Sequence, residues 1–207
     1  MTKNYYLMSV HWIRGEGYFA NSYVFGSVLV DAGVSPVALK PFRDDIDTII
    51  LTHCHYDHIA RVKEISHLCE AKVCIHKDDA GGLVDETPSL ALMFGERSPG
   101  IVPDRMLSDG DIIKDLLVIH TPGHTPGGIC LYNKEEKFLI SGDTVFSDGG
   151  YGRFDFPGGN ADKLKASIKR LSSLDVKALY PGHGDPMSSG GSENIGMALS
   201  MIEMSSY

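Results

Sequence analysis

Four short apolar runs in this sequence each end in a turn that carries histidine or aspartate side chains. The runs cover residues 47–51, 116–120, 138–140 and 176–179, and they have the length and composition of buried strands. Glycines in three of these turns let the backbone bend sharply and expose the next side chain. The pattern predicts a sheet-containing protein whose strand ends bring polar side chains together at one edge.

The densest turn follows the first run and reads Thr52-His53-Cys54-His55-Tyr56-Asp57-His58. Residues two apart in extended backbone point to the same side, so His53 and His55 can offer imidazoles to one ion. The chain then turns into the next helix, and the adjacent Asp57 and His58 can face a second ion. Imidazole and carboxylate groups are the ligands expected for zinc, iron or manganese. A polar helix start with unliganded side chains is the better explanation for any single histidine, but three histidines and an aspartate within six residues favour a metal site.

Three more candidate ligands lie in the other turns, each directly after a glycine: His124, Asp143 and His183. With the first cluster, they make seven candidate ligands at four strand ends. Five of the nine histidines of the chain belong to this set, so chance clustering explains it poorly.

The remaining pattern predicts an α+β chain in which strands dominate and helices are interspersed. Further strands are expected at 23–31, 72–76, 111–114 and 128–132, the first of them broken at Gly26. Helices are expected at 59–70, at 86–95, after Asn160 or Asp162, and at 192–203. No linker, charge block or repeat divides the sequence, so we expect a single domain over residues 1–207.

Composition restricts the partners and the cellular location of the chain. Its 19 basic and 27 acidic residues give a net charge of −8, which argues against nucleic acid or an anionic membrane as partner. No apolar run approaches the roughly 20 residues that span a bilayer, and residues 1–7 lack the pattern of a secretory signal. The four cysteines form no C-x-x-C pair, which favours reduced thiols in a cytoplasmic protein. The sequence does not indicate an oligomeric state.

In order and spacing, the seven ligands resemble the pattern of the metallo-β-lactamase superfamily, over a region from about Asp31 to His183. The resemblance implies a four-layer αββα sandwich of two mixed sheets, with a two-metal site at one edge. It assigns one metal to His53, His55 and His124. It assigns the other metal to Asp57, His58 and His183, with Asp143 as the bridge.

Two further roles follow from the same resemblance. Asp31 matches an aspartate that orients a ligand histidine, although a turn residue before Gly33 is an equal alternative. We expect two divalent ions per chain, with zinc favoured and iron or manganese as alternatives. Two such ions about 3.5–4 Å apart can hold a hydroxide, because the pKa of metal-bound water falls to about 7. We expect Asp57 to act in catalysis as well as in metal binding.

Residues 141–159 resemble the loop after the bridging aspartate in the glyoxalase II group, which hydrolyses thioesters such as S-lactoylglutathione. Arg153 falls where that group carries a basic residue for a carboxylate of the thiol, and Tyr151 could line the pocket. The alternative for Arg153 is a surface position or a pair with Asp155. Only 24 residues follow His183, fewer than a helical glutathione-binding domain needs, so another small acyl-thiol is also possible.

Other functions remain open on the same ligands. The related persulfide dioxygenases use one iron at the positions of His53, His124 and Asp143, and ligand count cannot separate them from hydrolases. A lactone or ester hydrolase is a third possibility. An aspartate at the bridging position disfavours β-lactam hydrolysis. Metal storage is disfavoured because structural zinc sites are usually closed by four ligands.

Overall fold

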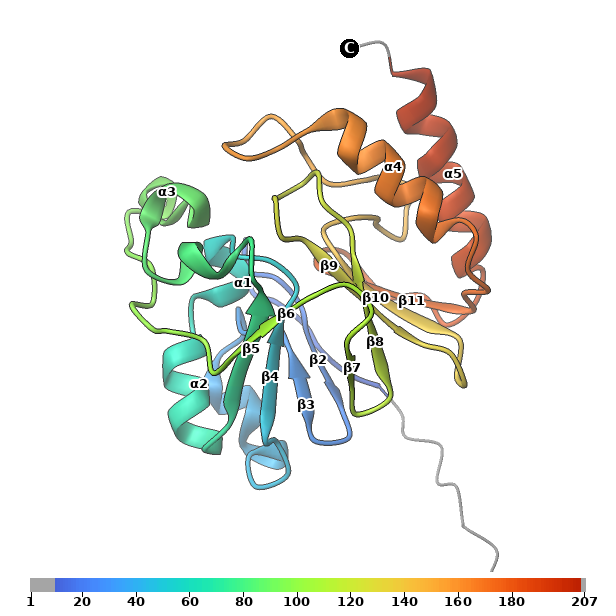
Figure 1. Cartoon of the computed structure of the whole chain (residues 1–207). Coiled ribbons are helices and arrows are strands. Elements are labelled where there is room, and N and C mark those ends of the chain that lie inside the picture. Colours follow the sequence, from blue (N-terminus) through green and yellow to red (C-terminus); the bar gives the residue numbers. More distant parts are fainter. Residues whose placement is uncertain (1–9, 206–207) are drawn as a thin grey trace, which may run out of the picture.

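Two β-sheets lie face to face in the computed structural model, and helices cover the outer face of each sheet (Figure 1). The structure describes residues 10–205. Residues 1–7, for which we expect no secretory signal, lie outside the described residues. The architecture is the α+β sandwich of two mixed sheets that the family resemblance implies.

The first sheet has the strand order β1-β2-β3-β4-β5-β6, antiparallel from β1 to β3 and parallel from β3 to β6. Its strands are β1 (His11–Ile13), β2 (Ser22–Phe25), β3 (Val28–Val30), β4 (Thr48–Leu51), β5 (Lys72–His76) and β6 (Arg105–Leu107). The second sheet has the order β11-β10-β9-β8-β7, and only β10 and β11 are parallel. Its strands are β7 (Ile112–Ile113), β8 (Leu116–His120), β9 (Ile129–Asn133), β10 (Phe138–Gly142) and β11 (Ala178–Pro181).

The apolar runs of the sequence are continuous because both faces of the central strands are buried. In β4, Ile49 and Leu51 pack in the core that includes α2 (Val62–Cys69) and the 3₁₀ helix η1 (Pro36–Phe42). Ile50, between them, points into the core between the sheets. Each such fully buried side chain contributes roughly 1.5–3 kcal/mol.

The second sheet follows the same alternation. In β9, Ile129 and Leu131 face the first sheet, while Cys130 packs with the helices α4 (Ala161–Leu171) and α5 (Gly191–Met204). The Asn160 side chain caps α4 by accepting a hydrogen bond from the Lys163 amide, which confirms Asn160 as the start of this helix.

Two helix predictions are wrong in detail. The helix expected at 59–70 is α2, which begins only at Val62, and a separate short helix, α1 (Tyr56–Ile59), precedes it. The Ala32 N–H donates to the His58 carbonyl oxygen, and the Arg61 N–H donates to the Ala32 carbonyl oxygen, at the junction of the two helices. The helix expected at 86–95 is divided into α3 (Glu86–Ser89) and the 3₁₀ helix η3 (Ala91–Phe94). Leu90 separates them with a left-handed backbone at φ 59°.

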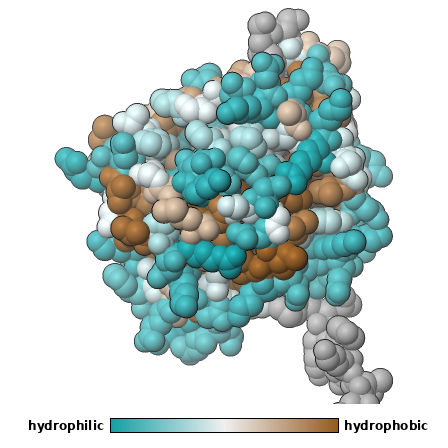
Figure 2. Space-filling model, in the orientation of Figure 1, coloured by the Kyte–Doolittle hydropathy of each residue, from teal (hydrophilic) through white to brown (hydrophobic). Residues whose placement is uncertain are grey.

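The short strands β1 and β6 and the 3₁₀ helix η2 (Ala80–Leu83) were not expected from the sequence. Hydrophilic side chains cover most of the face in Figure 2, and the apolar side chains exposed there form separate patches. Within residues 10–205, no helix has both the length and the apolar character needed to cross a membrane. All four cysteines are buried free thiols. The single domain and the cytoplasmic location stay predictions.

Candidate metal centre

The seven predicted ligands lie together where four strands end at the same edge of the sandwich. β4 leads into the loop with His53 and His55 and then into α1, which carries Asp57 and His58. His124 follows β8, Asp143 follows β10 and His183 follows β11. Their donor atoms form groups within 4.8 Å of one another: His53, His55 and His124; His53, His58 and Asp143; Asp57, His58 and His183.

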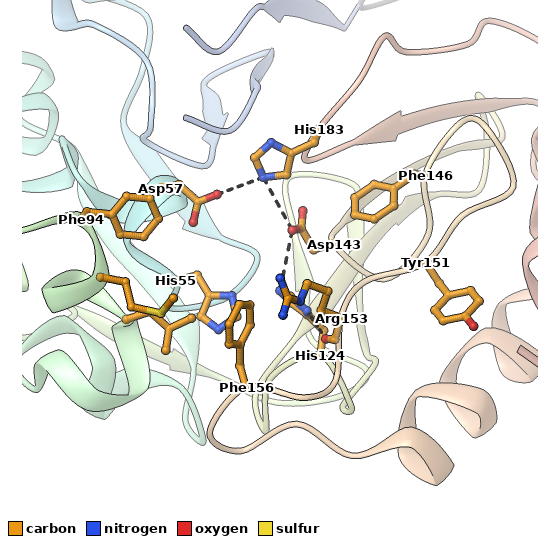
Figure 3. A pocket seen from close by; sticks show the side chains of 12 residues that line it. His55, Asp57, Phe94, His124, Asp143, Phe146, Tyr151, Arg153, Phe156 and His183 are labelled. Carbon is orange, nitrogen blue, oxygen red and sulfur yellow. Dashed lines mark hydrogen bonds and ion pairs between the residues drawn. The ribbon is translucent and has the colours of Figure 1, made fainter. Parts of the chain in front are cut away.

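Asp143 lies between His124 and His183, which belong to the first and the third of these groups (Figure 3). Its Oδ1 atom is 3.3 Å from His58 Nε2, and its Oδ2 atom is 3.7 Å from His124 Nε2 and 3.6 Å from His183 Nε2. His183 Nε2 also lies 3.0 Å from Asp57 Oδ2. A single carboxylate therefore faces histidines of the first and the third group, which is the position that a bridging ligand requires.

Burial and neighbouring charges set the protonation of the ligands. Burial lowers the pKa of His55 to about 3 and, with neighbouring imidazoles, holds that of His53 well below its usual range. Both rings are therefore neutral at physiological pH and present lone pairs. Burial opposes charge on His58 and Asp143 as well. The attraction between their opposite charges outweighs this effect of burial, so the pKa of His58 is raised and that of Asp143 is lowered.

The donor set fits divalent metal ions. Four buried atoms of these side chains have no hydrogen-bond partner among the described residues: His55 Nε2, His58 Nε2, His124 Nε2 and Asp143 Oδ1. A buried polar atom without a partner costs about 1–3 kcal/mol, so four such atoms in one cluster of metal-binding side chains favour a metal site. Imidazoles and carboxylates suit zinc, iron or manganese.

Hydrogen bonds to the opposite ring nitrogens orient two of the ligands. His58 Nδ1 donates to Asp31 Oδ2 at 2.8 Å, and the Thr52 backbone and hydroxyl donate to the same carboxylate. His124 Nδ1 lies 2.6 Å from the carbonyl oxygen of Arg153. Such contacts fix the tautomer and direct Nε2 of each ring toward the ligand cluster. The structure thus places Asp31 against a ligand histidine, with its own backbone left-handed at φ 59°.

The sequence reasoning missed Asp79, a buried carboxylate that connects two ligand loops. Its Oδ2 atom accepts hydrogen bonds from the Cys54 amide at 3.0 Å and the Thr125 hydroxyl at 2.8 Å, and its Oδ1 atom accepts one from the Gly127 amide. Cys54 lies between His53 and His55, and Thr125 follows His124. The sequence did carry a signal for this residue, because Asp79 closely follows the end of the expected strand β5, at the same edge of the sheet as the ligands.

A pocket of about 340 Å³ opens over the ligands. Besides the ligands His55, Asp57, His124, Asp143 and His183, its lining consists of Leu90, Met93, Phe94, Phe146, Tyr151, Arg153 and Phe156. Figure 3 shows Phe94, Phe146 and Phe156 on different sides of the metal ligands. The substrate side of the site is therefore largely apolar.

The two predicted substrate-binding residues line this pocket, but both have partners within the protein. Arg153 donates to Asp155 from Nε at 2.9 Å and from Nη2 at 2.7 Å, and its guanidinium lies 4.3 Å from the ring centre of Phe156. The pair with Asp155 was the alternative foreseen from the sequence. The Tyr151 hydroxyl lies 3.0 Å from Ser205 Oγ and points away from the metal ligands in Figure 3.

Comparisons with known proteins agree with this geometry. The family model described as "Metallo-beta-lactamase superfamily" matches residues 15–183. A hydroxyacylglutathione hydrolase of Haemophilus influenzae, GloC, is 31% identical over 170 residues, which are 76% of this chain and 80% of the relative.

Two solved structures are similar over nearly their whole length. TTHA1623, solved in a di-iron-bound form, has a TM-score of 0.77 and 30% identity and aligns over 93% of this chain and 97% of its own. The BLEG-1 B3 metallo-β-lactamase has a TM-score of 0.80 and 27% identity, with the same coverage of 93% and 97%.

Proposed function

Because this chain belongs to the metallo-β-lactamase superfamily, we propose that it is a binuclear metal-dependent hydrolase that cleaves the thioester of a small acyl-thiol. The observation that carries the proposal is Asp143, which faces histidines of both ligand groups in the floor of an open pocket. The similarity to a hydroxyacylglutathione hydrolase supports a thioester as the substrate. S-lactoylglutathione is therefore the reference substrate for a first assay.

Each metal position has its own residues in this proposal. His53, His55 and His124 would hold one ion, Asp57, His58 and His183 would hold the other, and Asp143 would serve both. Two bound ions, with zinc favoured and iron or manganese as alternatives, would supply a hydroxide nucleophile at neutral pH and polarise the substrate carbonyl.

Asp57 is the proposed proton acceptor. Burial works against its charge, but His58 and a hydrogen bond from His183 hold its pKa below the usual range. It is therefore ionised at neutral pH and can receive the proton that the nucleophilic water loses. Water adds to the thioester carbonyl carbon, the C–S bond breaks, and a proton returns to the leaving sulfur, so the products are a carboxylic acid and a free thiol.

The test is hydrolysis of S-lactoylglutathione and of a neutral thioester by protein loaded separately with zinc, iron and manganese. We expect thioester cleavage that Asp143→Asn reduces to the background rate, because a neutral amide in place of the carboxylate cannot supply an anionic bridge. The same samples are assayed with a β-lactam, since one structural neighbour is a B3 metallo-β-lactamase. Cleavage of the β-lactam but of neither thioester would contradict the proposal. Thiol-dependent oxygen uptake without hydrolysis would contradict it as well and would indicate a dioxygenase.

A further inference from the structure

The one positively charged side chain among the described residues of the pocket, Arg153, is paired with the carboxylate of Asp155. Arg153 is the only lysine or arginine among the described residues that line the pocket. Two of its nitrogens donate to both oxygens of Asp155, at 2.9 and 2.7 Å. This is the paired geometry with which a guanidinium binds a carboxylate, so Asp155 occupies the place that a substrate carboxylate would take.

Apolar side chains surround the metal ligands from two directions. Leu90, Met93 and Phe94 come from the α3–η3 segment, whereas Phe146 and Phe156 come from the loop after β10. The Phe156 ring lies 6.0 Å from the ring of His55, centre to centre, so apolar surface begins beside the ligands. The rings of Tyr18 and Tyr56 pack against Phe94 at 4.9 and 5.4 Å and fix this wall.

From these two observations we propose that the pocket selects acyl-thiols with an apolar, uncharged acyl group, and that the Arg153–Asp155 pair disfavours thiol carriers that bear a carboxylate, such as glutathione. The proposal rests on the thioester hydrolase function above. An acyl chain gains by leaving water for the walls of the pocket. A carboxylate would first have to displace Asp155 from Arg153.

Thioesters of N-acetylcysteamine test the acyl preference, because this carrier has no charge. We expect kcat/KM to rise about fourfold for each methylene from acetyl to hexanoyl, the factor expected for burial of one CH₂ group. The hexanoyl thioester should also exceed S-lactoylglutathione. A flat series, or S-lactoylglutathione as the better substrate, would overturn the proposal. Failure of every thioester would instead refute the hydrolase function.

A binding measurement separates the two proposals further. S-alkyl thioethers of N-acetylcysteamine lack the reacting carbonyl, so calorimetry reports their affinity without turnover. We expect the Kd to fall by about the same factor per methylene from ethyl to hexyl. A Kd that does not depend on chain length would overturn the apolar-acyl proposal, whatever the activity of the protein.

Two adjacent residues of η3 provide a matched pair of variants. Met93 and Leu92 are both 67% exposed, but only Met93 lines the pocket. Met93→Ser should therefore flatten the dependence on acyl length, whereas Leu92→Ser should keep the wild-type slope. Equal slopes in the two variants would remove this wall from substrate recognition.

Asp155→Asn tests the role of the ion pair. Release of Arg153 should lower the KM for S-lactoylglutathione about two- to fivefold, the range of an exposed ion pair, and leave the hexanoyl thioester unchanged. The double variant Arg153→Gln/Asp155→Asn should lose this gain, because the gain requires the guanidinium. An unchanged KM in Asp155→Asn would overturn the proposed exclusion of carboxylates.

Discussion

Asp79→Asn is the substitution that tests how the ligand loops are held. The Asp79 carboxylate accepts hydrogen bonds from Cys54 in the loop of His53 and His55, and from Thr125 and Gly127 beside His124. Asparagine has nearly the same shape, but its amide nitrogen can only donate. If the amide oxygen keeps the hydrogen bonds from Cys54 and Thr125, the amide nitrogen must face the Gly127 N–H group, and two donors then meet.

The cost follows from these contacts. A hydrogen bond to a charged group contributes about 1.5–3 kcal/mol, and a buried N–H left without an acceptor costs about 1–3 kcal/mol. Loss of the negative charge offsets part of this, because burial disfavours the ionised form and raises the pKa of Asp79. We expect the free energy of unfolding to fall by about 2–4 kcal/mol, which corresponds to a Tm about 5–15 °C lower in a chain of this size.

The assay combines urea denaturation of the metal-free protein with a zinc titration against a competing chelator. Because Asp79 fixes both loops around the first metal position, zinc affinity should weaken about 10–100-fold. Asp78→Asn is the matched control, because Asp78 is the adjacent residue and its side chain is 47% exposed. Wild-type stability together with wild-type zinc affinity in Asp79→Asn would refute this reasoning.

Three further substitutions have defined outcomes. His55→Ala should abolish activity and keep cooperative urea unfolding, because its ring lies at the loop edge of the sandwich; loss of cooperativity would contradict this. Asp31→Asn should weaken zinc binding about 10–100-fold in a chelator competition, since His58 loses its charged partner; an unchanged Kd would count against it. Asp109 accepts hydrogen bonds from Arg170, which lower the pKa of its carboxyl group. The stability that this pair contributes to the fold is therefore present above the unfolded-state pKa of about 3.9 and is lost as the pH falls through the folded-state pKa. Asp109→Asn should thus cost up to about 1 kcal/mol in urea denaturation at pH 7, and this cost should shrink as the pH is lowered below about 3.9; a cost that does not change with pH would exclude the ion pair as its source.

The ligands could be predicted from the sequence because each carries its signal locally. His124, Asp143 and His183 each follow a glycine at the end of an apolar run, and strand ends meet at an edge of a sheet. The division of the strands into two mixed sheets has no such local signal and was expected only from the family resemblance, and the order of strands within each sheet was not predicted. The break at Leu90 was missed because a left-handed leucine is rare.

Contacts between distant segments explain what the sequence did not reveal in the site. Asp79 matters because Cys54 and Gly127, 25 and 48 residues away, converge on its carboxylate. Arg153 and Asp155 are two residues apart, yet their pairing could only be named as an alternative from the sequence. The proposed preference for apolar acyl groups depends in addition on Leu90, Met93 and Phe94, which line the pocket from another segment of the chain.

Elemental analysis of protein purified without added metal, with both assays run on the same sample, tests the two-metal hydrolase assignment. We expect about two divalent ions per chain, zinc in preference to iron or manganese, and thioester cleavage that a chelator abolishes and metal restores. One iron per chain, with thiol-dependent oxygen uptake and no thioester cleavage, would contradict the assignment.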